Sequence, residues 1–535
     1  MDSDLSFRSV SHTILQLTSF TFIATILYVL STIIYNLYFH PLSQFPGPKL
    51  FASSRIFSIY HSLRGTLTHK ITSLHQTYGH VVRTAPDTLS FTSAQALQDI
   101  YTRKNGRPPF PKDPILYTQP ADGEKSSILS VIDDKDHTRY RRLLSHAFSE
   151  KALREQEPLI KKYIDLLIQR LYENEKKGNQ DMVHWYNFTT FDIIGDLTFG
   201  DSFGCLDKSD YHPWVSFIFV SFKAAAFMAA AKRFGPLVKM VLDKLIPKRL
   251  IQQRRNHQEL THSKVAERLE RKTERKDFMT YILRHNHDTE NGMSIPEIKA
   301  TAGVLLLAGS ETTATLLSAV TYYLLKEGNE EILARLTQEI RTSFKNEEEI
   351  HMGSVNQLKY QLAVLEETMR IFPPAPSGGP RIVPGDGQWV DGFWVPGGTS
   401  VSCLAYATHH DSLNFTDPNA FIPERWLATD TDTPENNLNL TNNEKGAHQP
   451  FSLGPRNCIG INLAYAEMRL ILARVLWNFD LELAAESRNW AEDMKVFLLW
   501  EKPELLVRLR GLGWRVRVGR RVRVGRRVRG GVGEE

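Results

Sequence analysis

The sequence predicts a mainly α-helical protein with a smaller β portion, preceded by an N-terminal transmembrane helix. Residues 9–48 contain no Asp, Glu, Lys or Arg, as expected of a membrane-spanning stretch. Residues 66–110 contain short β-branched runs separated by Gly and Pro, which is typical of a small sheet. From residue 137 onward, apolar positions recur at spacings of three and four, which indicates helices.

The composition is that of a globular protein and excludes some classes of function. The chain has 535 residues, of which 42% are hydrophobic and 23% charged, so it is too long for one ordinary core. Its net charge is +5, but residues 515–535 carry eight Arg and two Glu, so the rest of the chain sums to about −1. A near-neutral body argues against a nucleic-acid partner.

The cysteines argue against a disulfide framework. Cys205, Cys403 and Cys458 are odd in number and far apart, which favours a reducing compartment.

The N-terminal apolar run is expected to be an uncleaved membrane anchor. Ile14 to Phe39 is long enough to span a bilayer, whereas the apolar part of a cleaved signal peptide, the alternative, would be about 7–15 residues. Lys49 and Arg55 follow the run, which weakly places the body in the cytosol. The next segment, Phe45-Pro46-Gly47-Pro48, stops the helix and stiffens the exit from the membrane.

Individual elements follow from periodicity and turn signals. Strands are expected at His80 to Thr84 and Thr88 to Phe91. A packed helix ended by Gly is expected within 187–206, a surface loop at 428–448 and a short strand from Val496 to Trp500. Further helices are expected over 137–172, 255–285, 297–327, 328–345 and 357–371.

The most informative stretch is Phe451-Ser452-Leu453-Gly454-Pro455-Arg456-Asn457-Cys458-Ile459-Gly460. A helix is expected from Ile459 to Phe479, so its dipole and free N–H groups would stabilise a thiolate at Cys458. Gly454 and Gly460 leave room for a flat ligand near the sulfur, and Arg456 offers a cation to a carboxylate of that ligand. The alternative is that Cys458 is a small buried hydrophobic residue.

A second candidate site lies within the helix expected from Pro296 to Lys326. Ala308-Gly309-Ser310 keeps the backbone open to a bulky neighbour, and hydroxyl residues after a mid-helix Gly favour a local bulge or a bound water. Glu311 and Thr312 then place an acid beside a hydroxyl where water could enter. The alternative is a helix that packs through small residues and has one surface Glu.

Two charged pairs have helical spacing. His137 and Arg141 are four apart, so both could reach one anion, although a basic helix face is usually just solvated. Glu367 and Arg370 are three apart, a spacing that most often gives an exposed pair worth about 0.2–0.5 kcal/mol.

The pattern Phe-x-x-Gly-x-Arg-x-Cys-x-Gly closely resembles the haem-binding loop of the cytochrome P-450 family. The resemblance implies the cytochrome P-450 fold and haem b, with the Cys458 thiolate as axial ligand of the iron. It also implies that Phe451, Gly454, Arg456 and Gly460 belong to the cofactor site.

Other motifs follow in the family's order, and their roles are implied by the resemblance. His137 and Arg141 resemble the helix that binds a haem propionate, although the family commonly has Trp at the position of His137, which leaves the role of His137 less certain than that of Arg141. Arg381 resembles a second propionate partner, a lone surface arginine being the alternative. Glu311 and Thr312 match the distal motif that delivers protons during oxygen activation. The family's structural triad corresponds to Glu367, Arg370 and Arg425. Residues 213–247 resemble the lid over the substrate, with ordinary core as the alternative.

The implied protein is a microsomal monooxygenase, most similar to fungal enzymes that tailor secondary metabolites, such as the isotrichodermin hydroxylase group. It would insert one atom of O₂ into an apolar small molecule, taking electrons from NADPH through a separate NADPH-cytochrome reductase. Membrane lipid would be a further partner, and the location would be the endoplasmic reticulum membrane, with a single span and a cytosolic catalytic domain.

The alternatives are an O₂-independent haem-thiolate isomerase or dehydratase, a xenobiotic-detoxifying monooxygenase and a non-enzymatic haem-binding membrane protein. The intact Glu311-Thr312 pair argues against the first and the last of these.

The expected organisation has four parts. Residues 1–39 form a luminal tip and anchor, 40–65 a proline-rich hinge and linker, 66–512 the catalytic domain and 513–535 a basic tail. The tail repeats Arg-Val-Arg-Val-Gly-Arg in tandem and departs from the family. A disordered extension or a gene-model artefact is favoured over a dedicated function.

Overall fold

The computed structural model describes residues 2–104, 106–117, 125–210, 223–224, 226–230, 232–233, 240, 248–271, 275–284, 286, 291–427, 443–492 and 494–513. Most of the expected lid at 213–247 and of the loop at 428–448 lies outside the described residues, as does the tail after residue 513.

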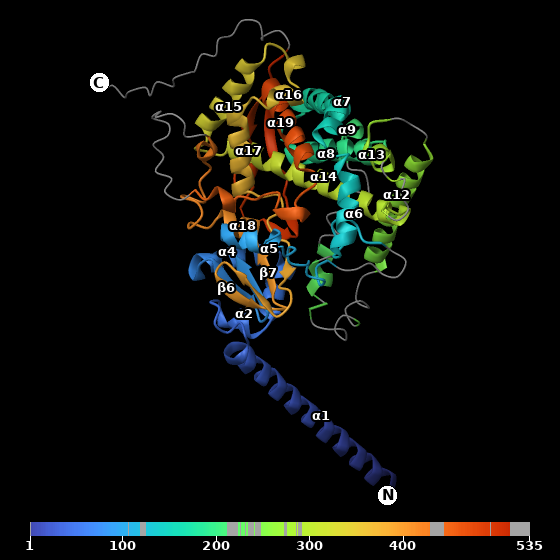
Figure 1. The fold of residues 1–535 in the computed structure, drawn as a ribbon, viewed down its shortest axis with the longest axis vertical. Coiled ribbons are helices and arrows are strands. Elements are labelled where there is room, and N and C mark those ends of the chain that lie inside the picture. The colour runs from blue at the N-terminus through green and yellow to red at the C-terminus, as the bar shows by residue number, and fades with distance from the viewer. Residues whose placement is uncertain are drawn as a thin grey trace, which may run out of the picture.

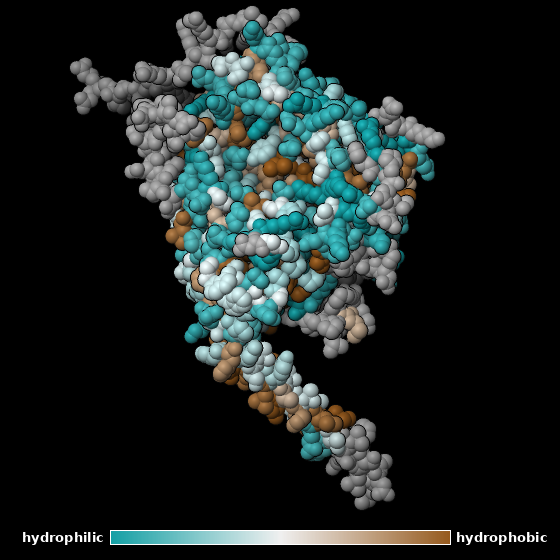
Figure 2. Space-filling view, viewed as in Figure 1, coloured by the Kyte–Doolittle hydropathy of each residue, from teal (hydrophilic) through white to brown (hydrophobic). Residues whose placement is uncertain are grey.

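The N-terminal helix projects from the body as a separate rod (Figure 1). Helix α1 (Asp2–Ile34) continues into the π-helical turn η1 (Tyr35–Phe39). Within the span His12–Phe39, an 18-residue window has a mean hydropathy of 2.0 and is 0% buried, and apolar side chains cover much of the rod in Figure 2. The predicted apolar helix is therefore confirmed, and it is long enough to cross a bilayer.

The body is built mainly of helices. Their bounds are α2 Lys49–Ser53, α3 Ile56–Arg64, α4 Leu67–Tyr78, α5 Ala94–Tyr101, α6 Asp134–Ser145, α7 Glu150–Asn174, α8 Met182–Phe199, α9 Cys205–Lys208, α12 Lys248–Glu270, α13 Phe278–Arg284, α14 Ile295–Leu325, α15 Glu330–Ser343, α16 Met352–Val355, α17 Lys359–Ile371, α18 Ala405–His409 and α19 Ile461–Asn478. The 3₁₀ turns are η2 Glu175–Lys177, η3 Glu347–Glu349, η4 Pro423–Trp426, η6 Lys445–Ala447, η7 Gly454–Arg456 and η8 Ala485–Ser487.

The strands form small sheets at the edges of the helical body. Their bounds are β1 Val81–Ala85, β2 Thr88–Phe91, β3 Gln180–Asp181, β4 Arg381–Ile382, β5 Gly387–Val390, β6 Phe393–Pro396, β7 Ser400–Cys403, β8 Phe479–Leu483, β9 Lys495–Phe497, β10 Leu499–Glu501 and β11 Leu506–Gly511. The largest sheet has the order β1-β2-β7-β4, and β2 pairs in parallel with β7 while the other pairs are antiparallel. In Figure 1, this sheet lies at the end of the body from which α1 leaves. The mainly α architecture with a minor β portion is confirmed.

Helix α14 forms the centre of the core because it is apolar on nearly all sides. It begins at a capping box made by Ser294 and Glu297. Helix α8 packs along it, and the two helices are joined by a hydrogen bond from Thr190 Oγ1 to the Ser310 carbonyl, 3.0 Å long. Gly309 permits this approach, because a Cβ there would lie 2.7 Å from Ile194 Cδ1. The core helices α8 and α14 therefore place the 308–312 segment in the middle of the body.

Several expected boundaries were wrong. The helix expected over 137–172 is broken into α6 and α7, and that over 255–285 into α12 and α13. The stretch from Val496 to Trp500 is not one strand but the hairpin β9–β10, which turns at Leu498 with a φ of 71°. A short apolar run does not reveal a turn that a non-glycine residue makes under tertiary constraint.

Candidate active site

Cys458 lies just before helix α19, as the sequence predicts. Its backbone N–H donates to the Phe451 carbonyl at 2.9 Å, and α19 begins at Ile461 with Gly460 as its N-cap residue. Cys205 and Cys403 are buried, whereas Cys458 is exposed. Desolvation nevertheless raises the pKa of the Cys458 thiol, and the Gly460 N–H and Arg141 oppose this rise. Burial therefore outweighs the helix terminus and Arg141 in its effect on the pKa of this thiol.

Two arginines clamp the loop that carries Cys458. Arg141 of α6 donates to the Asn457 carbonyl and, at 2.6 Å, to Asn457 Oδ1. Arg456 donates to the carbonyls of Val131 and Ile132 at 2.7 and 2.6 Å and to Asp134 at 2.7 Å. The Arg456 donors therefore bind the segment that leads into α6. Contact between Arg456 and a ligand carboxylate stays a prediction.

The structure explains Gly454 by a tight backbone turn, whereas the sequence suggested that it leaves room for a flat ligand. Gly454 has a φ of 72°, and a Cβ there would lie 2.1 Å from the Tyr101 carbonyl oxygen, so the tight turn against α5 requires glycine. A Cβ on Gly460 would make ordinary contacts, at 3.8 Å from Phe148 and 4.0 Å from Cys458 Sγ. Gly460 is thus the glycine next to the sulfur. Phe451 is half-buried, with its ring 5.3 Å from that of Tyr465.

One stripe of the central helix is accessible although the helix lies in the core. Val304, Ala308 and Thr312 recur every four residues on α14 and are partly or fully exposed, whereas Leu305 and Leu306 beside them are buried. The helix runs without a break through this region, so the expected bulge is absent here. The Thr312 hydroxyl instead donates to the Ala308 carbonyl at 2.6 Å. Thr312 therefore lies on an accessible stripe of α14, and its hydroxyl is bonded to the helix backbone.

Glu311 does not share that face. Successive residues on a helix are rotated by about 100°, and Glu311 lies in the core, where its carboxylate accepts from Lys502. Lys502 also donates to Thr315 Oγ1 at 2.7 Å. Burial raises the pKa of Glu311, and Lys502 opposes that rise. A lysine distant in the sequence thus covers this acid, a contact that no local pattern indicates.

Basic side chains from separate segments meet near the Cys458 loop. His137 and Arg381 are both 5% exposed. Burial and the nearby charges of Arg456, Lys112 and Arg141 lower the pKa of His137 to about 3. Nε and Nη1 of Arg381 are buried without a hydrogen-bond partner among the described residues. The structure thus brings the predicted residues His137, Arg141 and Arg381 into one electrostatic neighbourhood and adds Lys112, which sequence analysis missed.

These features fit haem. No group of three or more His, Cys, Asp or Glu side chains in the described part of the chain could hold a metal ion. The buried nitrogens of Arg381 that have no partner among the described residues fit a site for an anion. The two carboxylates of haem b would supply such an anion.

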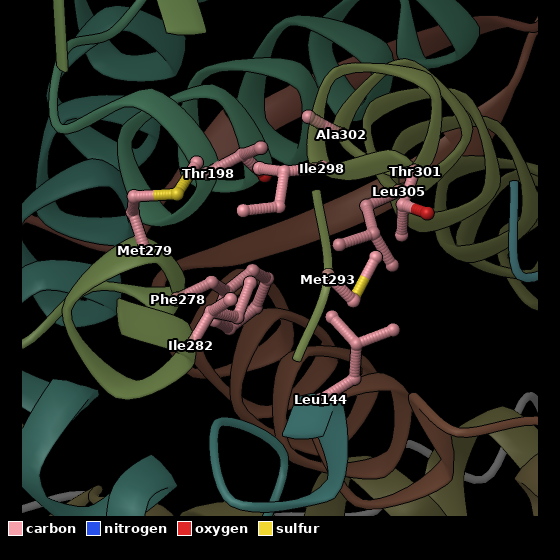
Figure 3. Close-up of a pocket in the computed structure, with 10 residues that line it drawn as sticks. All are labelled: Leu144, Thr198, Phe278, Met279, Ile282, Met293, Ile298, Thr301, Ala302 and Leu305. Carbon is pink, nitrogen blue, oxygen red and sulfur yellow. The ribbon is translucent and has the colours of Figure 1, made fainter. Parts of the chain in front are cut away.

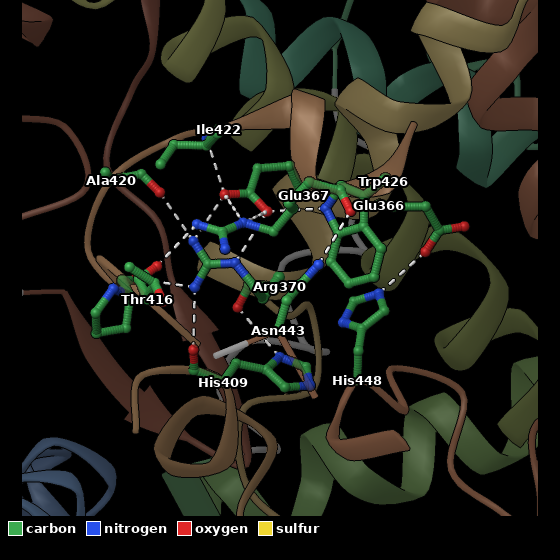
Figure 4. A network of polar contacts seen from close by, with 12 residues as sticks. Glu366, Glu367, Arg370, His409, Thr416, Ala420, Ile422, Trp426, Asn443 and His448 are labelled. Carbon is green, nitrogen blue, oxygen red and sulfur yellow. Dashed lines mark hydrogen bonds and ion pairs between the residues drawn. The ribbon is translucent and has the colours of Figure 1, made fainter. Parts of the chain in front are cut away.

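The expected triad is assembled around one buried carboxylate (Figure 4). Glu367 accepts from Arg370 Nε at 2.9 Å and Nη2 at 2.8 Å, and from Arg425 Nε at 3.1 Å. Trp426 Nε1 and the Ile422 N–H complete the set at 2.8 and 2.9 Å. Arg370 also donates to the carbonyls of His409, Pro418 and Ala420. The network therefore joins α17 to the segment 409–426 and is structural in its geometry.

A closed apolar cavity lies beside the N-terminal half of α14 (Figure 3). It is lined by residues of α6, α8, α13 and α14, among them Leu144, Thr198, Phe278 and Leu305. Its volume of about 10 Å³ is at the lower limit for one water molecule. The cavity ends about two turns before Thr312. It is therefore too small to be a substrate site.

Comparison with known proteins agrees with this geometry. The family model described as Cytochrome P450 matches residues 46–508. The chain is 47% identical over 477 residues to cytochrome P450 monooxygenase astA of Talaromyces wortmannii, covering 89% of this chain and 94% of that protein. It is 43% identical to averantin hydroxylase of Dothistroma septosporum, covering 91% and 90% of the two chains. It is also 43% identical to trichothecene C-15 hydroxylase of Fusarium sporotrichioides, covering 90% and 96%. The chain with this accessible cysteine and this cation cluster belongs to the cytochrome P450 family of haem-thiolate monooxygenases.

Proposed function

We propose that this chain is a membrane-anchored monooxygenase that hydroxylates an apolar intermediate of fungal secondary metabolism, a terpenoid or a polyketide. The observation that carries the proposal is the accessible Cys458 thiol on a loop that Arg141 holds. Relatives at 43% identity named averantin hydroxylase and trichothecene C-15 hydroxylase support the reaction class.

Each predicted site residue has a role in this proposal. Cys458 would be the axial ligand of haem b, with Gly460 beside the sulfur and Phe451 on the loop. Arg381, His137 and Arg141 would bind the carboxylates of the haem, and Gly454 and Arg456 would hold the loop in shape. Bound haem with a thiolate ligand supplies the activation of O₂. Glu367, Arg370 and Arg425 would stabilise the fold behind the cofactor.

Thr312 and Glu311 would manage protons in different ways. Thr312 lies on the accessible stripe of α14, so its hydroxyl could hold a water or donate to a bound molecule. Glu311 is engaged by Lys502, so it could act only after this pair opens or through its effect on the helix. Thr312→Ala is therefore expected to lower turnover directly.

The proposed organisation follows the same boundaries as the sequence expectation. Residues 1–39 would anchor the chain in the endoplasmic reticulum membrane, 40–65 would link, and 66–512 would form the catalytic domain in the cytosol. The tail 513–535 would add no dedicated function. Electrons would come from a separate NADPH-cytochrome reductase, and membrane lipid would surround α1.

The first experiment asks whether the purified protein holds a thiolate-ligated haem. The reduced protein with carbon monoxide should give the absorbance band of a thiolate-ligated haem, and Cys458→Ser should lose it, whereas Cys403→Ser should keep it. A wild-type protein without haem would contradict the proposal.

The second experiment identifies the reaction. Metabolite profiles are compared between a host that expresses this chain with its neighbouring biosynthetic genes and one that expresses Cys458→Ala. A precursor lacking one oxygen atom should accumulate in the second host. A precursor of equal mass would favour an isomerase, and matching profiles would favour detoxification.

A further inference from the structure

Lys112 lies directly opposite Arg381 across an isolated antiparallel bridge. The Ile382 N–H donates to the Pro111 carbonyl at 2.9 Å, and the Asp113 N–H donates to the Pro380 carbonyl at 3.1 Å. In this arrangement the two opposed residues are a non-hydrogen-bonded pair, whose side chains are on one face with their Cα atoms about 4.5 Å apart. Like charges at such positions destabilise a pair of strands. The bridge therefore juxtaposes two cations that need a shared anion.

No carboxylate among the described residues supplies that anion. Lys112 and Arg381 are each 5% exposed. Lys112 Nζ donates to the Leu129 carbonyl and lies 4.7 Å from the centre of the Tyr117 ring. In the described part of the chain, no carboxylate forms an ion pair with Lys112 or Arg381. Two nitrogens of Arg381 have no partner there either.

The nearby acids are engaged elsewhere. The Asp113 carboxylate binds Arg233 at 3.3 Å and accepts from Ser400 Oγ at 3.0 Å. Asp134 binds Arg456 at 2.7 Å. A buried cation without a compensating charge is unfavourable, so the arrangement makes sense when an anionic ligand completes it.

The electrostatics of the neighbours indicate one common site. Burial, together with Arg456 and Arg381, lowers the pKa of Lys112 to about 7. Lys112 and Arg381 in turn contribute to the lowered pKa of His137. Lys112 therefore faces the same residues that the proposed function assigns to the haem carboxylates.

We propose that Lys112 is a further cofactor-binding residue, whose ammonium group binds a haem carboxylate alongside Arg381. The inference rests on the proposed function, because it requires haem near Cys458. A charge-assisted hydrogen bond between ammonium and carboxylate would neutralise the opposed pair and fix the strand β4 against the segment of Lys112. Lys112 thus couples cofactor binding to the folding of the segment before α6.

The test measures how fast haem leaves the full-length protein in detergent. Haem transfer to excess apomyoglobin is followed by absorbance for the wild type, Lys112→Met and Lys112→Arg. Lys135→Met is the matched control, since Lys135 is exposed on α6 and the substitution changes the charge equally. Lys112→Met should lose haem on the order of tenfold faster, while Lys112→Arg and Lys135→Met should stay close to the wild-type rate. Equal rates for Lys112→Met and the wild type would overturn the inference.

A second arm separates a cofactor role from a structural role. The proteins are reconstituted with haem dimethyl ester, in which both carboxylates are blocked. The difference between the wild type and Lys112→Met should then disappear. A difference that persists with the ester would mean that Lys112 only supports the fold. Should Lys112→Met fail to fold, the wild type and Lys112→Arg are each loaded with haem and with the ester. If both proteins release the ester no faster than haem, carboxylate contacts do not hold the cofactor and the inference is overturned. A wild-type protein that takes up no haem would instead contradict the proposed function.

Discussion

Lys502 donates from its ammonium group to the carboxylate of Glu311, and their side chains are only 1% and 5% exposed. The pair connects the loop after β10 to the middle of α14. Lys502 covers Glu311, which precedes Thr312 in the sequence, and Glu311 faces away from the accessible stripe of α14.

Removing Lys502 alone should destabilise the protein. Lys502→Met leaves a buried carboxylate without its partner, a change that typically costs about 3–5 kcal/mol. Glu311 would take up a proton, because burial already raises its pKa. Denaturant unfolding of the two proteins measures the difference.

The double variant tests the pair itself. Glu311→Gln with Lys502→Met removes both charges, so it should be more stable than Lys502→Met alone, and the double-mutant cycle should give a coupling energy of about 1–3 kcal/mol. Additive effects of the two substitutions would mean that the ion pair contributes nothing.

Glu367→Gln should be one of the most damaging substitutions in the chain. Glu367 is 0% exposed, and its two oxygens accept from Arg370, Arg425, Trp426 and Ile422. An amide would turn an acceptor into a donor facing arginine, with an expected loss of about 3–5 kcal/mol. Glu366→Gln is the matched control on the same helix, because Glu366 is 18% exposed and bonds only Tyr465 and His448 among the contacts described. It should lose about 1 kcal/mol. Equal unfolding free energies for the two variants would contradict the assignment.

Acid should destabilise the protein through His75. Burial lowers the pKa of His75 to about 4, while in the unfolded chain it is about 6.5. The unfolded state therefore binds more protons between these values, so stability is full above about pH 6.5 and falls as the pH drops toward 4. At about 1.4 kcal/mol per pKa unit, the effect reaches roughly 3 kcal/mol.

The His75 contribution can be isolated by substitution. His75 bonds Ser90 Oγ and the Gly79 carbonyl, each at 2.8 Å. His75→Gln should be less stable than the wild type near pH 7, and the difference should shrink by about 2 kcal/mol near pH 5, because glutamine does not titrate. Urea unfolding at the two pH values gives the result. A constant difference would show that His75 is not the titrating group.

Deleting residues 2–34 should release the protein from membranes without unfolding it. The deletion stops before Asn36, which donates to the Ser53 carbonyl at 2.9 Å and accepts from Arg83 at 2.9 Å. The full-length chain should stay in the membrane pellet at high salt because His12–Phe39 is long and apolar enough to cross a membrane. The shortened chain should move to the supernatant with its thermal transition unchanged. Its full retention in the pellet would show that the body binds membrane by itself.

Local sequence determined much of this protein. The charge-free N-terminal run predicts α1, the apolar periodicity predicts α14 and α17, and the pattern around Cys458 predicts the loop before α19 together with its chemistry. These features depend on residues close in the chain, where helix periodicity and caps act. Even the partners Glu367 and Arg370 could be read from their spacing.

Only the tertiary structure decided which distant charges meet. Lys502 and Glu311 are 191 positions apart, and Lys112 faces Arg381 only because the segment before α6 lies against β4. The need for glycine at position 454 arises from the carbonyl of Tyr101, which the chain brings there from α5. Charge pairing and close approach depend on distance in space. The periodicity of residues along the chain gives no information on the distance between segments that are far apart in the sequence. The loop, its cysteine and the cations Arg141 and Arg381 could thus be predicted from sequence, whereas the position of Lys112 opposite Arg381 and the pairing of Glu311 with Lys502 could not.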